Sequence, residues 1–312
     1  MIPLPTVSII VPCYNSAATL RSCLAGLLKQ NYPAFQVIVV DDGSSDDTVS
    51  IAKEYPVTLI RTSKNSGPGA ARNLAIQESR TDLVVFFDSD CFVEDTDWLQ
   101  RHVQMHQRPT IGIVGGGILG VGAGLVARAD SYCHWLTNIP NAKPADITFT
   151  SGPSLTKFSC HLVSTNMSVK RQVFEKIGGF DEQFRTGEDV DFCERTVRAG
   201  FTIRFQPDII VKHWDRCNLR DFLLCYYRMG KDRIPVRRKH STKFLWLLPR
   251  GVFSSLVMCL PLALALPLQP IFAWWPYKKR VVFYYPVMFL ATVATALGLV
   301  DYFISPHKRP IR

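Results

Sequence analysis

The feature that most constrains the fold of this chain is an alternation of strand-like and helix-like segments that precedes Asp88. Four short runs rich in β-branched and apolar residues are typical of buried strands: 7–11, 37–40, 57–60 and 83–87. Helices are predicted between them, from apolar spacing over 20–28, at 48–53, and at 70–78 after a Gly-Pro-Gly turn. Such alternation indicates a parallel α/β sheet, whose ligands gather at the carboxyl ends of the strands.

The following segment is less regular. Residues 111–165 show no clear period, although 111–124 are apolar and rich in glycine. Order returns with a strand at 166–169 and helices at 170–177 and 188–199, the last of which is closed by Gly200. Two short strands are predicted at 201–205 and 209–211. We therefore expect one α/β domain over residues 1–219.

The C-terminal third is both basic and apolar. After residue 219 it carries 15 Lys and Arg against three acids, which leaves 21 of the chain's 36 basic and 23 of its 26 acidic residues for positions 1–219. A basic excess beside apolar runs suggests an anionic membrane surface. No RNA-binding motif or zinc-finger spacing is present, so no nucleic-acid partner is expected. We expect a basic linker or amphipathic segment at 220–243, two hydrophobic membrane segments within 244–304 and a basic tail at 305–312.

Two uncharged runs, 251–275 and 281–300, are long enough to span a membrane, which takes about 20 residues. Basic residues on their outer flanks favour cytosolic ends for both: Arg233, Arg237, Arg238, Lys239, Lys243, Lys308, Arg309 and Arg312. The basic residues 278–280 between the runs disagree with two spans, and prolines interrupt the first run. A re-entrant hairpin or interfacial helices are therefore an alternative, and a pair of buried soluble helices is another.

The N-terminus and the cysteines bear on the compartment. Residues 1–5 have neither a basic nor an apolar signal-peptide region, which predicts no cleaved leader. The nine cysteines form no CxxC pair, and their odd number does not suit a disulfide framework. Reduced thiols are therefore expected, in a membrane-associated protein whose globular part lies on the cytoplasmic face.

Asp88-Ser89-Asp90 directly follows the fourth predicted strand. Residues two apart on a strand point the same way, so both carboxylates can approach one hard cation. Mg²⁺ or Mn²⁺ held in this way completes its coordination with phosphate oxygens and water, and it can neutralise a departing diphosphate. A D-x-D motif alone is common in surface turns, but the end of a buried strand favours the metal interpretation.

An acidic turn, Asp41 to Thr48, follows the second predicted strand. One carboxylate, for which we favour Asp42, can accept from a nucleobase N–H, while others can cap the next helix. After the first strand come Pro12, Cys13, Tyr14 and Asn15, where Tyr14 offers a face for stacking a base. Arg72 lies in the helix opened by the Gly-Pro-Gly turn and is a candidate phosphate or base contact. The spacing there matches neither a P-loop nor a dinucleotide fingerprint.

Glu188 and Asp189 open a late helix. A capping box with Thr186 and Asp189 would explain the acids structurally, and acids in a first turn also suit the helix dipole. The functional alternative is a general base that deprotonates an acceptor hydroxyl. His213 is similarly open, because a single histidine is usually structural but imidazole can join two carboxylates on Mn²⁺.

Together these segments resemble the ordered signature of family 2 glycosyltransferases. The resemblance rests on VSIIVPCYN at 7–15, VDDGSSDDT at 40–48, GPGAARN at 67–73 and FDSD at 87–90. It continues with Asn166, GGFDE at 178–182, GEDVD at 187–191, Arg195, Ala199, Gly200 and His213. It covers about residues 6–215, and the order of so many motifs is highly specific.

The resemblance implies a GT-A fold: an α/β, Rossmann-like, mostly parallel sheet flanked by helices, here with a C-terminal membrane-associated helical region. It implies an enzyme that transfers sugar with inversion from a nucleotide-sugar donor, with uridine preferred, and uses a divalent metal (Mn²⁺ or Mg²⁺). The implied roles are donor binding for Pro12, Tyr14, Asn15, Asp42, Arg72, Asp88 and Ser89; metal binding for Asp88, Asp90 and His213; catalysis for Asp189 as base with Glu188; and acceptor contact for Asn166.

One departure from the family pattern bears on the product. The Gln-x-x-Arg-Trp motif of processive members is absent after the Glu-Asp helix, so transfer of a single sugar to a glycan or lipid-linked acceptor is expected. A non-catalytic scaffold that binds nucleotide sugar is the alternative. A nucleotidyltransferase fits less well, because residues 12–15 do not form a glycine-rich basic loop for a triphosphate.

Overall fold

The computed structural model describes residues 4–134, 142–149, 162–240 and 250–305. Two compact units divide the chain: Met1–Ile118 with Lys143–His213, and Leu119–Ala142 with Trp214–Arg312. The first unit ends at His213, close to the predicted boundary at 219. Residues 119–142, placed by the sequence within the first domain, group with the C-terminal unit instead.

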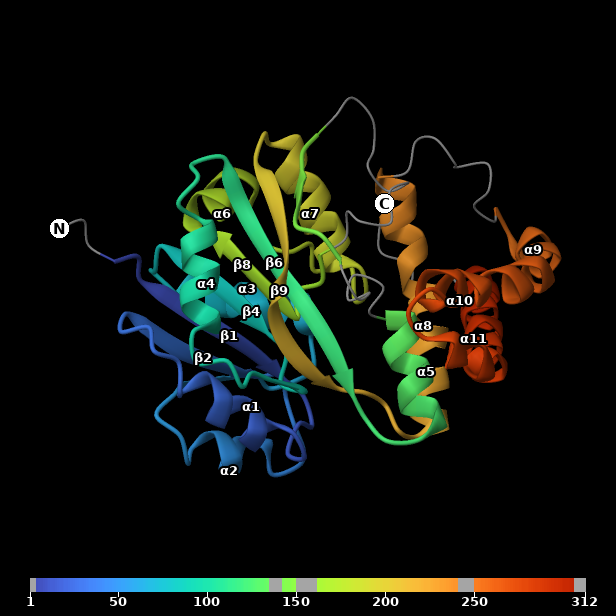
Figure 1. Cartoon of the computed structure of the whole chain (residues 1–312), viewed down its shortest axis with the longest axis horizontal. Coiled ribbons are helices and arrows are strands. Elements are labelled where there is room, and N and C mark those ends of the chain that lie inside the picture. Colours follow the sequence, from blue (N-terminus) through green and yellow to red (C-terminus); the bar gives the residue numbers. More distant parts are fainter. Residues whose placement is uncertain (1–3, 135–141, 150–161, 241–249, 306–312) are drawn as a thin grey trace. The chain divides into compact units, whose positions relative to one another are not determined.

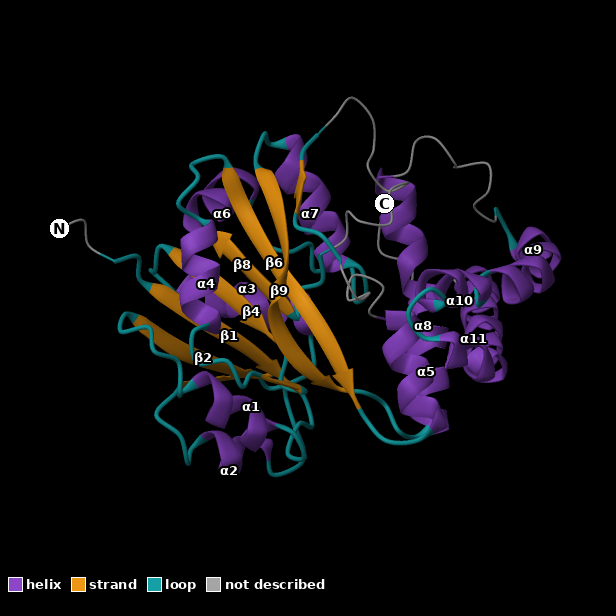
Figure 2. Cartoon of the chain, viewed as in Figure 1, coloured by secondary structure: helices purple, strands orange, loops and turns teal. Residues whose placement is uncertain are grey.

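The N-terminal half of the first unit confirms the predicted alternation (Figures 1 and 2). Its strands are β1 (Val7–Cys13), β2 (Phe35–Asp41), β3 (Thr58–Arg61) and β4 (Leu83–Phe87), and its helices are α1 (Leu20–Leu27), α2 (Thr48–Ala52) and α3 (Pro68–Glu78). The four strands are parallel in the order β3-β2-β1-β4. The β-branched side chains of β1, β2 and β4 are buried, as expected for a sheet covered on both faces, whereas those of the edge strand β3 are exposed or half-buried.

The other half of the sheet is antiparallel where pairing is resolved, which the sequence did not predict. β8 (Asn166–Lys170) runs antiparallel to β4, and β6 (Ile111–Val121) runs antiparallel to β8. β9 (Thr202–Trp214) follows β6 in the sheet order and pairs with two short antiparallel strands, β5 (Cys91–Phe92) and β7 (Ala145–Ile147). The segments predicted as two strands at 201–205 and 209–211 are therefore one strand.

The glycines of β6 explain why its sequence shows no strand-like alternation of apolar and polar residues. A Cβ on Gly116 would lie 2.1 Å from the carbonyl oxygen of Ile209 and 2.2 Å from Asn166 Nδ2, and one on Gly115 would lie 2.4 Å from Leu162. Glycine is therefore required by close neighbours from distant parts of the chain, and it erases the alternation that marks a strand.

Three more helices complete the described part of the first unit: α4 (Trp98–Met105), α6 (Arg171–Ile177) and α7 (Glu188–Arg198). The last two match the predicted helices closely, whereas α4 was not predicted. The register of β4 on β8 pairs Phe87 with Asn166. This pairing brings the residues before Asn166 next to Asp88.

The second unit is helical. It contains α5 (Leu125–His134), α8 (Leu219–His240), α9 (Val252–Ala265), α10 (Leu268–Trp274), the 3-10 helix η4 (Lys279–Tyr284) and α11 (Tyr285–Ile304). The predicted basic linker at 220–243 is thus largely a helix. Phe222, Trp274, Val281, Met288 and Ala291 are buried in one apolar core with Ala129 of α5. The stretches Val252–Trp274 and Lys279–Ile304 are long and apolar enough to cross a membrane by length and composition.

Candidate active site

The loops after β1, β2 and β4 meet at the carboxyl edge of the parallel strands. Ser16, in the loop after β1, lies 2.8 Å from Ser89 between their hydroxyl oxygens. Asn15, at a φ of 52°, donates its N–H to Ser44 Oγ at 2.9 Å and accepts the N–H of Ser45 through its side chain at 2.9 Å. Three of the predicted donor motifs are therefore held together by hydrogen bonds between the loops.

Asp42 is buried and accepts hydrogen bonds from its own chain. The N–H of Gly67 donates to Asp42 Oδ2 at 2.8 Å, the N–H of Ser66 donates to both oxygens at 3.0 Å, and the Thr62 hydroxyl donates to Oδ1 at 3.0 Å. Asp42 thus orders the loop that leads into α3. A nucleobase N–H at this carboxylate would have to share an oxygen with these donors.

The Tyr14 ring is exposed and can contact a ligand, whereas the Asp46 carboxylate is already used in hydrogen bonds within the protein. The Tyr14 side chain belongs to an exposed residue, with 52% of its surface accessible, which leaves a ring face open beside the loop. Asp46 instead accepts the N–H groups of Thr48 and Ala17, so a local turn and a contact with the loop after β1 account for it. Pro12 lies within β1 rather than after it.

Arg72 joins two of the predicted motifs. Its side chain is buried in α3, and its two terminal nitrogens reach Asp88 Oδ1 at 2.7 Å and Glu188 Oε1 at 2.8 Å. The guanidinium lies 5.6 Å from the centre of the Phe180 ring. A planar fork with several fixed donors can hold two carboxylates in this way, whereas a lysine ammonium could not fix both geometries.

Glu188 is buried at the start of α7. Burial and, after it, the neighbouring charge of Asp189 raise the pKa of its carboxyl to about 7, against the opposing effect of Arg72. A carboxyl with such a pKa exchanges protons near neutral pH.

Asp189 is half-buried next to Glu188, and its Oδ1 accepts the N–H of Val190 at 2.7 Å. The capping box considered for Thr186 and Asp189 does not form: Gly187, at a φ of 86°, occupies the N-cap position and no side chain caps the helix. Asp189 is therefore not required as a helix cap.

Asp88 has a further partner that the sequence did not suggest. The Thr165 hydroxyl donates to Asp88 Oδ2 at 2.7 Å, while Arg72 contacts Oδ1. The carboxylate is therefore oriented from both sides. Thr165 belongs to no recognisable motif, and only the β4–β8 register places it here.

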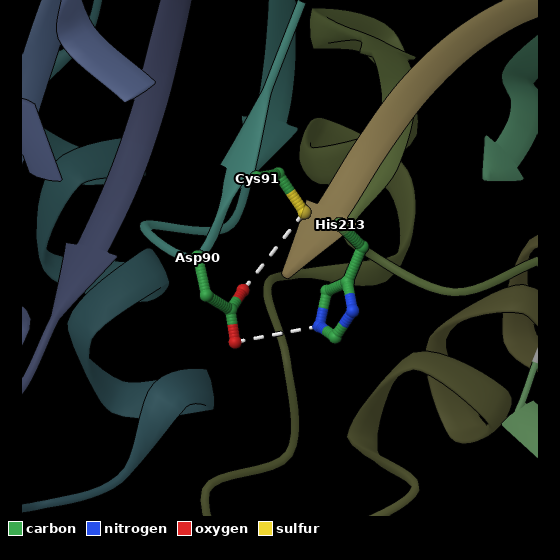
Figure 3. Close-up of side chains that lie close together, drawn as sticks. All are labelled: Asp90, Cys91 and His213. Atoms are coloured by element: carbon green, nitrogen blue, oxygen red, sulfur yellow. Dashed lines mark hydrogen bonds and ion pairs between the residues drawn. The ribbon is translucent and has the colours of Figure 1, made fainter. Parts of the chain in front are cut away.

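Asp90, Cys91 and His213 form a cluster whose potential ligand atoms all lie within 4.8 Å of one another. Figure 3 shows the Asp90 carboxylate directed toward the ring of His213, and His213 Nε2 lies 3.4 Å from Asp90 Oδ2. The antiparallel pairing of β5 with β9 sets Cys91 opposite His213 and so brings the cluster together.

This donor set fits a divalent cation such as Mn²⁺ or Mg²⁺. A carboxylate oxygen and an imidazole nitrogen suit Mn²⁺, and Asp88 lies two residues away on the same loop. Cys91 is not expected to be a ligand of such an ion, because Mn²⁺ and Mg²⁺ prefer oxygen ligands to a soft thiol sulfur.

Asn166 does not share this open environment. Its amide is buried and donates to the carbonyl oxygens of Gly117 at 2.9 Å and Ile209 at 2.8 Å, while Oδ1 accepts from Trp98 Nε1 at 3.1 Å. His102 Nε2 lies 2.9 Å from the same oxygen, so Nε2 must carry the proton. In the described structure the Asn166 amide is thus fully used in hydrogen bonds within the core. It lies near Asp88 but is not directed toward an acceptor site.

Comparisons with known proteins identify the family and the fold. The family model described as glycosyl transferase family 2 matches residues 8–178, and one described as the N-terminal domain of galactosyltransferase matches residues 154–214. The chain is 30% identical over 263 residues to the glycosyltransferase AglE of Haloferax volcanii, which covers 78% of this chain and 81% of that protein.

Two further similarities extend to most of the chain. A dolichyl N-acetyl-alpha-D-glucosaminyl phosphate 3-beta-D-2,3-diacetamido-2,3-dideoxy-beta-D-glucuronosyltransferase of Methanococcus voltae is 23% identical over 264 residues, covering 80% of each chain. The solved structure of the mannosyltransferase PcManGT from Pyrobaculum calidifontis, in complex with GDP-Man and Mn²⁺, superposes with a TM-score of 0.60 at 20% identity, covering 96% of this chain and 88% of that one. At this identity the second similarity shows a shared fold.

Proposed function

This chain belongs to glycosyl transferase family 2 and is a glycosyltransferase that acts on nucleotide sugars, and on that premise we propose a more specific reaction. It transfers one sugar, with inversion, from a UDP-sugar to a hydroxyl of a lipid-linked or cell-envelope glycan acceptor. The observation that carries the proposal is the buried bridge of Arg72 between Asp88 and Glu188. It holds the donor loop and the Glu188-Asp189 pair on either side of one guanidinium.

Asp189 is the proposed base. The acceptor hydroxyl oxygen attacks the anomeric carbon of the donor while its proton passes to the Asp189 carboxylate. The bond from the anomeric carbon to the diphosphate oxygen breaks, and its electron pair leaves with the nucleoside diphosphate. Attack from the face opposite the leaving group inverts the anomeric centre.

The leaving group is bound on the other side of Arg72. Asp90 and His213, with Asp88 as a further carboxylate, would hold a divalent cation that neutralises the diphosphate charge. Arg72 adds a fixed positive charge, and Glu188 is a second proton-exchanging carboxyl beside the base. Ser89 is held by Ser16 and so keeps the donor loop in place.

The nucleoside is proposed to lie against Tyr14. The exposed ring can stack on the base, while Asn15 and Asp42 keep the surrounding loops in place and Asp42 shares an oxygen with the imide N–H of uracil. A screen of UDP-, GDP- and dTDP-sugars for Mn²⁺-dependent thermal stabilisation tests which nucleobase the donor carries. A ligand at 100 times its Kd adds about 2.7 kcal/mol, and stabilisation by another nucleotide alone would remove the uridine assignment.

The acceptor proposal rests on the C-terminal unit. Two stretches apolar enough for a membrane follow the catalytic unit, and enzyme at the membrane finds lipid-linked acceptors more readily than soluble ones. We place the catalytic unit on the cytoplasmic face, because the basic residues that flank these stretches favour that side. Equal transfer to soluble and lipid-linked acceptors by the purified enzyme would count against a lipid-linked substrate.

The transfer step itself is tested with Asp189→Asn. This variant should bind donor with nearly unchanged affinity and lose transfer by about 100-fold or more, because it cannot take the proton. The matched control is Glu194→Gln, which removes a carboxylate from the same helix, where Glu194 pairs with Arg198. Transfer by Asp189→Asn at the rate of the control would remove Asp189 from the base role.

A further inference from the structure

Helix α11, the longest apolar helix, packs closely along α8 within the second unit. A Cβ on Gly298 would lie 2.0 Å from the carbonyl oxygen of Tyr227, and one on Gly230 would lie 2.0 Å from that of Thr295. The two backbones therefore approach directly, and each glycine is needed for that approach. The Tyr227 hydroxyl donates to Asp301 Oδ2 at 2.7 Å, and Lys231 forms an ion pair with the same carboxylate.

The contact extends over most of α11. Phe222 shares the core with Met288 at one end, and Arg238 lies 5.5 Å from the ring of Phe303 at the other. Residues 288 to 303 cover about 22 Å of helix, which is most of the hydrocarbon thickness of a bilayer, about 30 Å. If α11 crossed a membrane, α8 would cross beside it.

Helix α8 is unsuited to such a position. Arg228 and Arg238 are exposed, and Lys231 and Asp232 are only half-buried. An arginine or lysine at the bilayer centre is among the most costly residues to insert, and intramembrane charges almost always face a protein interior. The tight packing of α8 on α11 therefore opposes a spanning orientation of α11.

The first apolar stretch, Val252–Trp274, is long enough in total to span a membrane, but a short turn interrupts it. It is divided into α9 of 14 residues and α10 of seven residues, with a break before Leu268 where Pro267 lies. At 1.5 Å per residue these helices are about 21 Å and about 10 Å long, and neither crosses a hydrocarbon core of about 30 Å.

The second unit nevertheless exposes several large apolar side chains, which is unfavourable for a surface that faces only water. Phe253, Leu256 and Val257 of α9 are exposed, and so are Phe272, Trp275 and Phe283 around the turn between α10 and η4. Phe253 is 81% accessible and Phe272 is 72% accessible. Apolar exposure on this scale marks a surface for a membrane or a partner. In α11, by contrast, the exposed large apolar residues are Leu290, Leu297 and Ile304, seven residues apart along one stripe.

The basic charge of residues 278–280 favours an anionic membrane as the partner of this surface. Lys278, Lys279 and Arg280 are all exposed between the aromatic residues Trp275 and Phe283. Among the second unit's described acids, Asp221 is exposed and the others are buried or half-buried. Aromatic side chains flanking a basic cluster suit the headgroup level of an anionic bilayer, where rings and cations are both favourable.

We propose that the second unit lies in the plane of one leaflet of an anionic membrane and does not cross it, with residues 278–280 at the headgroups. Its exposed apolar residues enter the leaflet, while α8 stays on the aqueous side. This extends the proposed membrane partner of the enzyme, but the test below measures topology and binding without transfer, so either idea can fail alone.

The topology test labels single introduced cysteines in the full-length protein in sealed vesicles. Lys279→Cys reports on the basic turn and Lys29→Cys on the first unit; both sites are exposed, and both variants carry Cys217→Ser because Cys217 is exposed. In vesicles where a membrane-impermeant maleimide labels Lys29→Cys from outside, it should label Lys279→Cys equally. Labelling of Lys279→Cys only after the vesicles are opened, or not at all, overturns the proposal.

The binding test uses flotation with vesicles of phosphatidylcholine alone or with one third phosphatidylglycerol. The triple variant Lys278→Gln, Lys279→Gln, Arg280→Gln should bind the anionic vesicles about 100-fold more weakly. Its matched control, Lys29→Gln, Lys53→Gln, Arg80→Gln, removes three exposed charges from the first unit and should bind as the unmodified protein does. Equal loss in both variants overturns the proposal, as does a self-associated protein that floats with neither vesicle.

Discussion

Arg72 and Glu188, 116 residues apart in the sequence, form a buried ion pair of 2.8 Å that joins α3 to α7. The same guanidinium contacts Asp88 at 2.7 Å. Substituting Arg72→Ala should lower transfer by about 100-fold or more, since a fixed charge beside the departing diphosphate is lost. It should also lower the free energy of unfolding by about 3 kcal/mol, because a buried carboxylate loses its partner.

The control for Arg72 is a pair of similar chemistry outside the bridge. Arg61 contacts the buried Asp41 at 3.2 Å, but its own side chain is 60% exposed. Arg61→Ala should therefore change stability by about 1 kcal/mol or less, because the lost partner is exposed and Asp41 keeps the hydrogen bond from the Ser44 N–H, and it should leave transfer nearly intact. Steady-state transfer rates and urea titrations in detergent distinguish the two variants. Equal effects would mean that the bridge has no special role.

Glu188 makes a pH dependence of stability testable. Burial, with the charge of Asp189, raises the pKa of Glu188 to about 7 in the folded protein, above the ordinary value of 4.5. The folded state therefore favours the protonated carboxyl, which adds to the free energy of unfolding. This stabilising contribution of Glu188 is fully present below pH 4.5 and is lost as the pH rises through 7. The Tm of Glu188→Gln should rise relative to the unmodified protein across that window. Parallel Tm curves from pH 5 to pH 8 would contradict the assignment.

The proposed metal site can be tested residue by residue. Asp90→Asn and His213→Ala should each weaken Mn²⁺ binding by about 10-fold or more, because the first removes the carboxylate charge and the second removes the imidazole nitrogen. Cys91→Ser is the matched control within the same cluster: a soft thiol sulfur is a poor ligand for Mn²⁺, so the affinity should hold. Calorimetric titration of the protein with Mn²⁺ gives all three affinities. Loss in Cys91→Ser as large as in His213→Ala would show that the thiol binds.

Asn166 is predicted to act on stability rather than on acceptor affinity. Asn166→Ala leaves Trp98 Nε1 and the carbonyl oxygens of Gly117 and Ile209 without their buried partner, and should cost about 3 kcal/mol. Asn31→Ala, whose side chain bonds Thr96 and Asp97 at an exposed position, should cost far less. Urea titration measures both. A stable Asn166→Ala protein with raised acceptor KM would restore the role that the family resemblance implies.

Local patterns predicted the parallel half of the sheet well, because each strand from β1 to β4 carries its own β-branched run and its own turn. They missed β6, whose glycines are dictated by Ile209 and Asn166 across the sheet rather than by neighbours in the chain. The candidate site divides in the same way. Asp88 and Asp90 stand out as a motif, whereas the contact of Thr165 with Asp88 depends on how β8 pairs with β4.

Interpretation of the C-terminal region shows the same limit. The two apolar runs were visible in the sequence, and composition alone allowed them to span a membrane. The glycine contacts of Gly230 and Gly298 with a facing backbone became visible only in three dimensions. A glycine in a helix has no sequence signal that says which other helix it touches.

The hydrogen bonds that Asp42 and Asn15 make with neighbouring loops have a consequence for the thermodynamics of binding at the proposed donor site. Both side chains hold backbone N–H groups, Asp42 those of Ser66 and Gly67 and Asn15 that of Ser45, in the protein alone. Ordering a flexible loop costs about 1–2 kcal/mol per residue. In this protein the loops are already ordered before the donor binds. Donor affinity therefore depends on the fit of the nucleobase and the sugar, and no binding free energy is lost in ordering the loops.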